Sequence, residues 1–239
     1  MRFESYSIRL LTTRIYMNIQ RAFFAFKRSP QKQLNKKRCK TLLIVSIFFL
    51  TTSCVSWLQP TLKQEIVEIK AGNYTLDKDH AALLFKINHM GFSSYVGRFN
   101  KFNVSLNFDP ENIEKSSIEA IIDMRSIDVN NSDFAATLLG PSWLDTQNFP
   151  QAVFRSVSIK KIDGEQLRIE GELTFLGVTK AVLMTAKLNG AANNPLTRVY
   201  TLGFTANLRF RRSDFGLKKF IPIVGDEVDI EIQSEFQRQ

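Results

Sequence analysis

The feature that most constrains the fold is an alternation of apolar and polar residues with a period of two, which begins at Tyr74 and continues almost to the C-terminus. Such alternation is typical of strands with one buried and one exposed face. It is clear over 102–108, where large apolar residues alternate with Asn103, Ser105 and Asn107. The pattern predicts about eight strands, at 83–87, 102–108, 118–124, 157–162, 167–175, 181–188, 199–210 and 228–236.

Turn residues separate these strands, at Asp109-Pro110, Asp163-Gly164, Gly177 and Asn193-Asn194-Pro195. Strands joined by short turns pair antiparallel, so the sequence predicts an all-β barrel or a β-sandwich. One stretch differs, because Asp133–Leu139 has helical spacing and Gly140-Pro141 follows it. We therefore expect one short helix between the third and fourth strands.

Phenylalanine is abundant, with 20 copies in 239 residues, and within the strands it lies mostly at the apolar alternating positions. An eight-stranded barrel either fills its interior with side chains or holds one small ligand. The pattern leaves both alternatives open. Residues that share one parity on two adjacent strands are expected to face the interior: Phe85, Ile87, Phe102, Val104, Leu106 and Phe108.

The positive charge of the chain is confined to its N-terminal segment. Residues 1–54 contain 11 Lys and Arg and one acid, Glu4, whereas the remaining residues contain 21 Lys and Arg and 22 Asp and Glu. A basic face for nucleic acid on the folded part is therefore not expected. Both cysteines, Cys39 and Cys54, also belong to this segment, so the folded part has no disulfide, thiol nucleophile or cysteine metal site.

The N-terminal segment has the pattern of a secretory signal. The basic stretch Lys36–Lys40 precedes Thr41–Leu58, 18 residues without a charge. The charge bias places the N-terminus in the cytoplasm and the rest of the chain outside. Two anchoring modes remain open: Leu50–Cys54 resembles a loose bacterial lipobox with Cys54 as the lipidated residue, and the apolar run is just long enough for an uncleaved signal anchor. We expect a targeting segment at 1–54, a tether at 55–71 and a folded domain at 72–239.

Several motifs, taken in order over about 160 residues, resemble the bacterial YceI-like family. Phe85–Ser93 is similar to its F-x-v-x-H-x-G-x-S strand. The other matching pieces are Tyr74–Asp77 with Asp79-His80, Gly97–Phe99, Phe108–Pro110, Ser126–Asp128, Phe149-Pro150 with Phe154–Ser156, Gly171–Thr174, Gly177–Thr179, Arg212–Gly216 and Gly225–Val228. The chain departs from the family near the helix, where many members have Arg-Asp and His-Leu and this sequence has Ser132–Phe134 and Gly140–Asp145.

The resemblance implies a periplasmic, eight-stranded, lipocalin-like β-barrel that binds a long isoprenoid lipid without catalysis, and possible roles in its transport or storage. The ligand would be a polyprenyl phosphate or a quinone. Two alternatives remain: an accessory protein that presents a quinone to a membrane cytochrome, and a structural module with a filled barrel. The residues expected to line the interior are Phe85, Ile87, His89, Phe99, Phe102, Val104, Leu106, Phe108, Ile122, Trp143 and Phe204.

Polar residues offer few catalytic or metal-binding sets. His80 and His89 are the two histidines, expected on neighbouring elements, and they favour structural hydrogen bonds or a lipid head-group contact over metal binding. We expect no catalytic residue, metal or cofactor. Arg98 and Arg212 are the head-group candidates, because an arginine can bind phosphate through two N–H groups. The alternative for the basic cluster of Arg209, Arg211, Arg212, Lys218 and Lys219 is a solvated edge. Trp143 is either a lid or ordinary core.

Overall fold

The structure is a computed structural model that describes residues 59–239, so Cys54, the apolar run and the 1–54 segment lie outside the described residues. The described chain contains one α-helix, α3 (Ser132–Leu138), and four short 3-10 helices, η2 (Ile66–Glu68), η3 (Ile113–Lys115), η4 (Met124–Ser126) and η5 (Arg212–Phe215). The strands are β1 (Gly72–His89), β2 (Ser93–Phe99), β3 (Phe102–Phe108), β4 (Ser117–Asp123), β5 (Ile127–Asp128), β6 (Gln151–Lys161), β7 (Gln166–Phe175), β8 (Val178–Asn193), β9 (Tyr200–Arg211) and β10 (Val224–Arg238).

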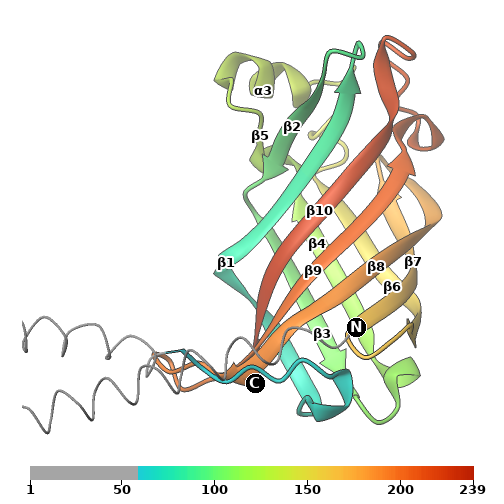
Figure 1. The fold of residues 1–239 in the computed structure, drawn as a ribbon. Helices are drawn as coiled ribbons and strands as arrows, with labels where there is room; N and C mark the ends of the chain where they lie inside the picture. The colour runs from blue at the N-terminus through green and yellow to red at the C-terminus, as the bar shows by residue number, and fades with distance from the viewer. Residues whose placement is uncertain (1–58) are drawn as a thin grey trace, which may run out of the picture. The chain divides into compact units, whose positions relative to one another are not determined.

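These strands form one antiparallel sheet that closes on itself. Its order is β10-β9-β8-β7-β6-β4-β3-β1-β2-β5, and the pairing of β10 with β1 completes the barrel (Figure 1). β2 and β3 pair with successive halves of β1, and β5 and β4 pair in turn with β2 and β3. β2 and β3 therefore act together as one interrupted strand, and so do β4 and β5. The prediction of an eight-stranded, all-β barrel with one short helix is confirmed.

Strand β1 is bent by an irregularity between Asp77 and Ala82 in its pairing with β10. Before the bend Tyr74 and Leu76 are buried, and after it Leu83 and Phe85 are buried, so the inward parity changes from even to odd residue numbers. Extra residues in a strand shift its side chains to the opposite face. The bend lets one long strand contribute apolar side chains to the interior along most of its length.

The two histidines both lie on β1, which corrects the expectation that they belong to neighbouring elements. His80 lies in the bend and His89 is the last residue of the strand. His89 follows His80 by nine positions of extended chain, which corresponds to up to about 30 Å at about 3.3 Å per residue. They are therefore too far apart to bind one metal ion together.

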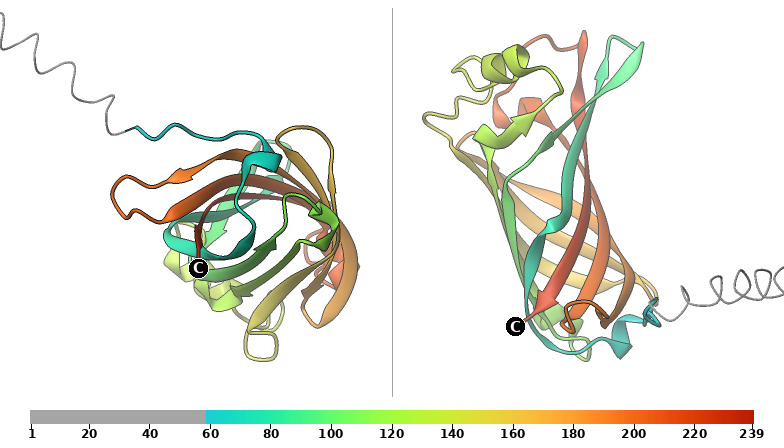
Figure 2. Two further views of the ribbon diagram at one scale, coloured as in Figure 1. Left: turned by 90° about the horizontal axis from the view of Figure 1, so that it is seen from below. Right: turned by 90° about the vertical axis from the view of Figure 1, so that its left-hand side faces the viewer.

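One end of the barrel is closed by the residues that precede β1. Ile66 and Ile69 are buried there, Lys63 pairs with Ala191, and the Ile66 amide donates to the Gly164 carbonyl at 3.0 Å. Part of the expected tether thus packs against the barrel. The C-terminus lies at this closed end, whereas α3, the β1–β2 hairpin and the β9–β10 loop lie at the opposite, open end (Figures 1 and 2).

The half of the barrel next to the closed end is filled with side chains. The ring of Phe204 lies 6.3 Å from that of Phe108 and 6.2 Å from that of Phe236, measured between centroids. Leu188 and Leu202 are completely buried in the same core. Aromatic and aliphatic packing of this kind gives the barrel a solid floor.

Among the helices of residues 59–239, none has both the length and the apolar character needed to span a bilayer.

Candidate functional site

The open half of the barrel contains a cavity of about 350 Å³. This volume is in the range of small-molecule sites, about 300–1,000 Å³. The cavity is lined by side chains from all ten strands, at positions above the packed floor. Side chains from α3 and from the segments that follow α3 and η5 complete the lining. Nearly all of them are apolar, and among the described residues that line the cavity His89 and Arg212 alone are histidine, lysine, arginine or acid. Such a cavity is suited to a ligand that is mostly hydrocarbon.

The cavity brings together many of the residues expected from the sequence to face the interior. The lining residues from that set are Phe85, Ile87, His89, Phe99, Phe102, Val104, Ile122 and Trp143. The other three, Leu106, Phe108 and Phe204, are buried in the core but do not line the cavity. They have the expected inward parity, but they lie closer to the closed end, where facing side chains fill the barrel.

A chain of aromatic rings crosses the open end of the barrel. The ring centroids of Tyr95 and Phe134 are 6.0 Å apart, those of Phe134 and Trp143 are 6.0 Å apart, and those of Trp143 and Phe220 are 5.9 Å apart. The first two contacts are edge-to-face, a favourable geometry for aromatic pairs. The chain links β2, α3 and the β9–β10 loop above the cavity. Trp143 therefore belongs to the cover of the cavity, and also to its lining.

The cavity reaches solvent beside the β1–β2 hairpin and the β9–β10 loop, which are bonded to each other. Of its lining residues, His89 and Phe220 are the two that are exposed to solvent. The sequence argument did not find Tyr95, Phe134 or Phe220 as lining residues. Tyr95 shares the parity of Phe99 and could have been found, but Phe134 and Phe220 lie outside strands, where alternation carries no information.

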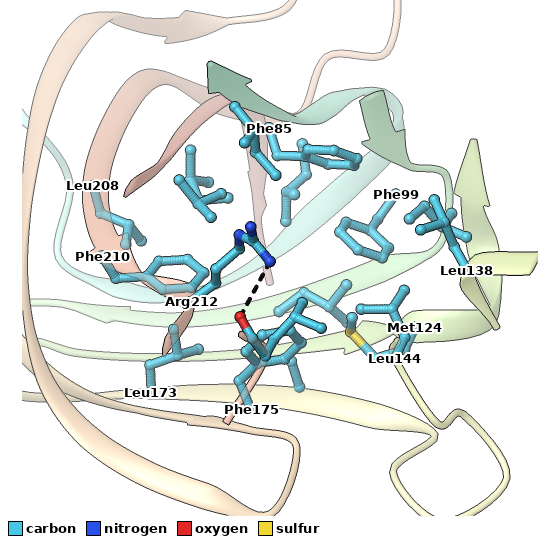
Figure 3. A pocket seen from close by; sticks show the side chains of 18 of the residues that line it. Phe85, Phe99, Met124, Leu138, Leu144, Leu173, Phe175, Leu208, Phe210 and Arg212 are labelled. Carbon is cyan, nitrogen blue, oxygen red and sulfur yellow. Dashed lines mark hydrogen bonds between the residues drawn. The ribbon is translucent and has the colours of Figure 1, made fainter. Parts of the chain in front are cut away.

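Arg212 is a buried cation at the wall of this cavity. Its side chain follows β9, and the residue is only 2% exposed. Nε donates to the Gly225 carbonyl at 2.8 Å, Nη1 to those of Leu217 and Lys219 at 3.2 and 2.9 Å, and Nη2 to that of Val224 at 3.0 Å. Figure 3 shows the guanidinium among Phe85, Phe210 and Phe175. These bonds fasten the β9–β10 loop to the end of β9.

Most donors of Arg212, one of the two head-group candidates, are already engaged within the protein. The four bonds to carbonyls leave one of its five N–H groups. Burial lowers the pKa of Arg212, and the charge of Asp226 acts in the opposite direction. The Asp226 carboxylate is itself bonded to the amide and hydroxyl of Ser213, at 2.9 and 2.7 Å. Arg212 is first of all the residue that holds the loop, and it adds positive charge beside an apolar cavity.

Arg98, the other head-group candidate, does not face the cavity. It lies between the inward residues Gly97 and Phe99 on β2, so its side chain points outward. There its guanidinium pairs with Asp128 on β5 at 3.1 Å. The pKa of Asp128 is lowered by the amide of Asn130, by Asn100 and by Arg98. Its position on the outer face excludes contact with a ligand inside the barrel.

Two other arginines near Arg212 in the chain, Arg209 and Arg211, also face away from the cavity. Arg209 forms ion pairs with Asp229 and Glu227 on β10, and Arg211 is exposed. Strand alternation explains this arrangement, because both residues are on the outward parity of β9. The interpretation of these two residues as a solvated edge fits their positions.

His80 belongs to a polar cluster on the outside of the barrel. Its Nδ1 lies 3.0 Å from a carboxylate oxygen of Asp77, which also accepts a bond from Gln237 at 2.7 Å. The ligand atoms of Asp77, His80 and Glu235 lie within 4.8 Å of one another, so these three could hold a cation. The hydrogen bond to Asp77 raises the pKa of His80. The existing bonds already account for the arrangement of these side chains.

Comparison with known proteins agrees with the fold. The sequence matches the YceI-like domain over residues 74–236. It is 36% identical to Protein YceI of Escherichia coli O157:H7 over 171 residues, which cover 71% of this chain and 88% of that relative.

Two solved structures have a similar barrel. BcnA of Burkholderia cenocepacia superposes with a TM-score of 0.61 and 26% identity over 67% of this chain and 98% of that one. A polyisoprenoid binding domain from Saccharophagus degradans gives 0.56 over 71% of this chain and 100% of that one, at 10% identity, a likeness of fold alone. With the motif order, the closed barrel and the matched length in agreement, the chain belongs to the YceI-like family.

Proposed function

We propose that this protein binds one long isoprenoid lipid inside its barrel and does not catalyse a reaction on it. The observation that carries the proposal is the apolar cavity above a packed floor. Removal of a hydrocarbon chain from water contributes about 25 cal/mol per Å² of buried apolar area, before the costs of ordering the ligand. The cavity lining offers mostly this kind of contact.

The lipid would enter with its hydrocarbon tail directed toward the packed floor. Its head would then remain near the open end, where His89 borders the mouth and Arg212 places a positive charge at the wall. A buried cation is stabilised by a nearby anion, because charges interact strongly away from water. This arrangement favours a phosphate head over the neutral ring of a quinone.

The ligand class is supported by the polyisoprenoid binding domain from Saccharophagus degradans, which has a similar fold. The test is to extract lipids from the full-length protein purified from its native host and to identify them by mass spectrometry. We expect a polyprenyl species strongly enriched over its share of the bulk membrane lipids. A quinone would instead favour presentation to a membrane cytochrome, and lipids in the bulk proportions would contradict the proposal.

We further propose that the barrel lies in the periplasm and is tethered to the membrane, where it stores or carries its lipid. The support is the basic stretch followed by an apolar run and Cys54. Radiolabelled palmitate should enter the wild-type protein but not Cys54→Ser. If the unlabelled variant stays tightly bound to membranes, the tether is an uncleaved signal anchor; equal labelling of both proteins would rule out lipidation at Cys54.

A further inference from the structure

Exposed apolar side chains gather on two loops around the cavity mouth. Met90 and Phe92, in the β1–β2 hairpin, are 52% and 87% exposed, and Phe220 and Ile223, in the β9–β10 loop, are 55% and 58% exposed. The Met90 amide donates to the Ile223 carbonyl at 3.1 Å, so the two loops adjoin. These four residues form one surface, here called the rim patch.

The rim patch differs from the other exposed apolar positions of the barrel. Elsewhere in residues 59–239 the large exposed apolar residues are Leu, Val and Ile: Leu62, Val67, Val96, Val157, Ile162, Leu183 and Leu196. Of the phenylalanines in residues 59–239, the two that are more than half exposed, Phe92 and Phe220, belong to the rim patch. Clustered apolar side chains on a surface mark sites of interaction, whereas single ones are common.

The β9–β10 part of the patch is held in place by the buried arginine. Arg212 donates to the carbonyls of Lys219 and Val224, on either side of Phe220 and Ile223. The Val224 amide in turn donates to the Phe220 carbonyl at 2.7 Å. Phe220 is thus held at the surface by a well-bonded loop, with its ring tilted by 53° relative to that of Trp143.

The charge of the two loops is complementary to an anionic surface. Lys218 and Lys219 lie in the β9–β10 loop, and neither 89–93 nor 216–223 contains an acidic residue. The Lys219 ammonium lies 4.8 Å from the centre of the Trp143 ring and bonds the Ser142 hydroxyl at 3.2 Å. Apolar side chains beside lysines suit the interface of a bilayer, where the rings enter the lipid and the ammonium groups meet lipid phosphates.

We propose that the rim patch docks on the surface of an anionic lipid bilayer, so that the cavity mouth opens directly onto the lipid. Docking would allow a long hydrocarbon chain to move between the bilayer and the cavity without being exposed to water. The described chain begins at the closed end, where Leu62 lies against Gly190, so the rim patch is at the other end of the barrel from the expected tether. The biological sense of docking rests on the proposed function, but docking itself needs no bound isoprenoid.

The experiment places an environment-sensitive fluorophore on the rim of the full-length protein. Phe92→Cys, in a Cys39→Ser/Cys54→Ser background, is labelled with a nitrobenzoxadiazole probe. The matched control is Leu196→Cys, because Leu196 is 84% exposed and lies in the β8–β9 turn at the closed end. Vesicles of phosphatidylcholine, with or without phosphatidylglycerol, are then added; none contains an isoprenoid.

We expect the probe at residue 92 to brighten several-fold with anionic vesicles and to be quenched by spin-labelled lipid, while the probe at residue 196 changes little. Lys218→Gln with Lys219→Gln should lower the apparent vesicle affinity several-fold. No brightening at residue 92, equal brightening at both sites, or an equal response to neutral vesicles would overturn the proposal. Lipid extraction decides the proposed function separately, because that measurement does not depend on docking.

Discussion

The ring of Phe85 occupies the space in which a side chain at Gly97 would lie. The two residues are paired across β1 and β2, and a Cβ atom on Gly97 would overlap both the Phe85 ring and Val129. The missing side chain at Gly97 therefore leaves room for the Phe85 ring beside β2.

Gly97→Ala should push the Phe85 ring into the cavity. We expect a loss of stability of about 1–3 kcal/mol, since added bulk in a packed region forces side chains out of their preferred positions. Binding of geranylgeraniol, an isoprenoid alcohol used as a test ligand, should also weaken, because the displaced ring would occupy part of the cavity. The control is Gly203→Ala on β9, where an added Cβ finds only ordinary contacts and replacement of a strand glycine should gain about 0.5–1 kcal/mol. Thermal unfolding of both variants measures these changes in stability. An unchanged unfolding temperature for Gly97→Ala would contradict the close packing of Phe85 against Gly97.

Arg212→Gln should loosen the β9–β10 loop. The side chain would leave several carbonyls unpaired, and each buried polar group without a partner costs about 1–3 kcal/mol. Arg211→Gln, at the exposed neighbouring position, should change stability by less than about 0.5 kcal/mol. Chemical denaturation compares the two variants. Equal stability would show that the four bonds of Arg212 contribute little.

The same pair of variants tests the lipid head group. If a phosphate lies near Arg212, Arg212→Gln should weaken the binding of geranylgeranyl phosphate much more than that of geranylgeraniol, because only the phosphate loses a charge-assisted contact. Arg211→Gln should leave both affinities unchanged. Isothermal titration measures all of them. An equal loss for both ligands would mean that Arg212 supports the loop and does not contact the head.

The hydrogen bond between His80 and Asp77 predicts a pH dependence. It raises the pKa of His80 above its ordinary value of 6.5, so the stability that it gives is fully present below pH 6.5 and is lost as pH rises through the raised pKa. Burial acts to raise the pKa of Asp77, but hydrogen bonds from His80, the Asp79 amide and Gln237 lower it overall, so that contribution is lost at acidic pH. Asp77→Asn should move the His80 pKa down toward 6.5, as followed by proton NMR. An unchanged titration would refute the interaction.

The assignment of inward and outward residues on β3 can be tested by introducing an aspartate on each face of the strand in turn. Leu106 is 5% exposed, whereas Asn103 is on the opposite, exposed face. Leu106→Asp should destabilise the barrel by on the order of 3–5 kcal/mol, because it buries an unpaired carboxylate. Asn103→Asp should be close to neutral. Similar unfolding temperatures for the two variants would show that the faces are assigned incorrectly.

Alternation along the strands was enough to predict an all-β barrel or a sandwich, since each strand has one face in the core, and the resemblance to the YceI-like family selected the barrel. It was not enough to locate the cavity, because Phe102 lines it while Leu106, on the same face of β3, packs into the floor. That difference depends on how strands far apart in sequence face one another. The bend in β1 also escaped prediction, because it reverses parity between Leu76 and Leu83.

Residues outside strands were the hardest to place from the sequence. Arg212 was grouped with Arg209 and Arg211 by their proximity in the chain, yet η5 turns its side chain into the barrel wall. Gly216, with φ of 89°, ends that turn in the left-handed region that glycine readily adopts. Local charge does not reveal such burial, which arises from carbonyls of the loop that folds back over the arginine.

The most direct test of a lipid-binding cavity is the number of geranylgeranyl phosphate molecules bound per delipidated full-length chain, measured by equilibrium titration. Ala120→Phe adds bulk inside the cavity, and Val157→Phe adds the same ring at a position that is 73% exposed on the outside. The wild type and Val157→Phe should each bind one molecule saturably, and Ala120→Phe should bind at least tenfold more weakly. Absent or non-saturable binding by the wild type, or equal affinity in Ala120→Phe, would contradict the account.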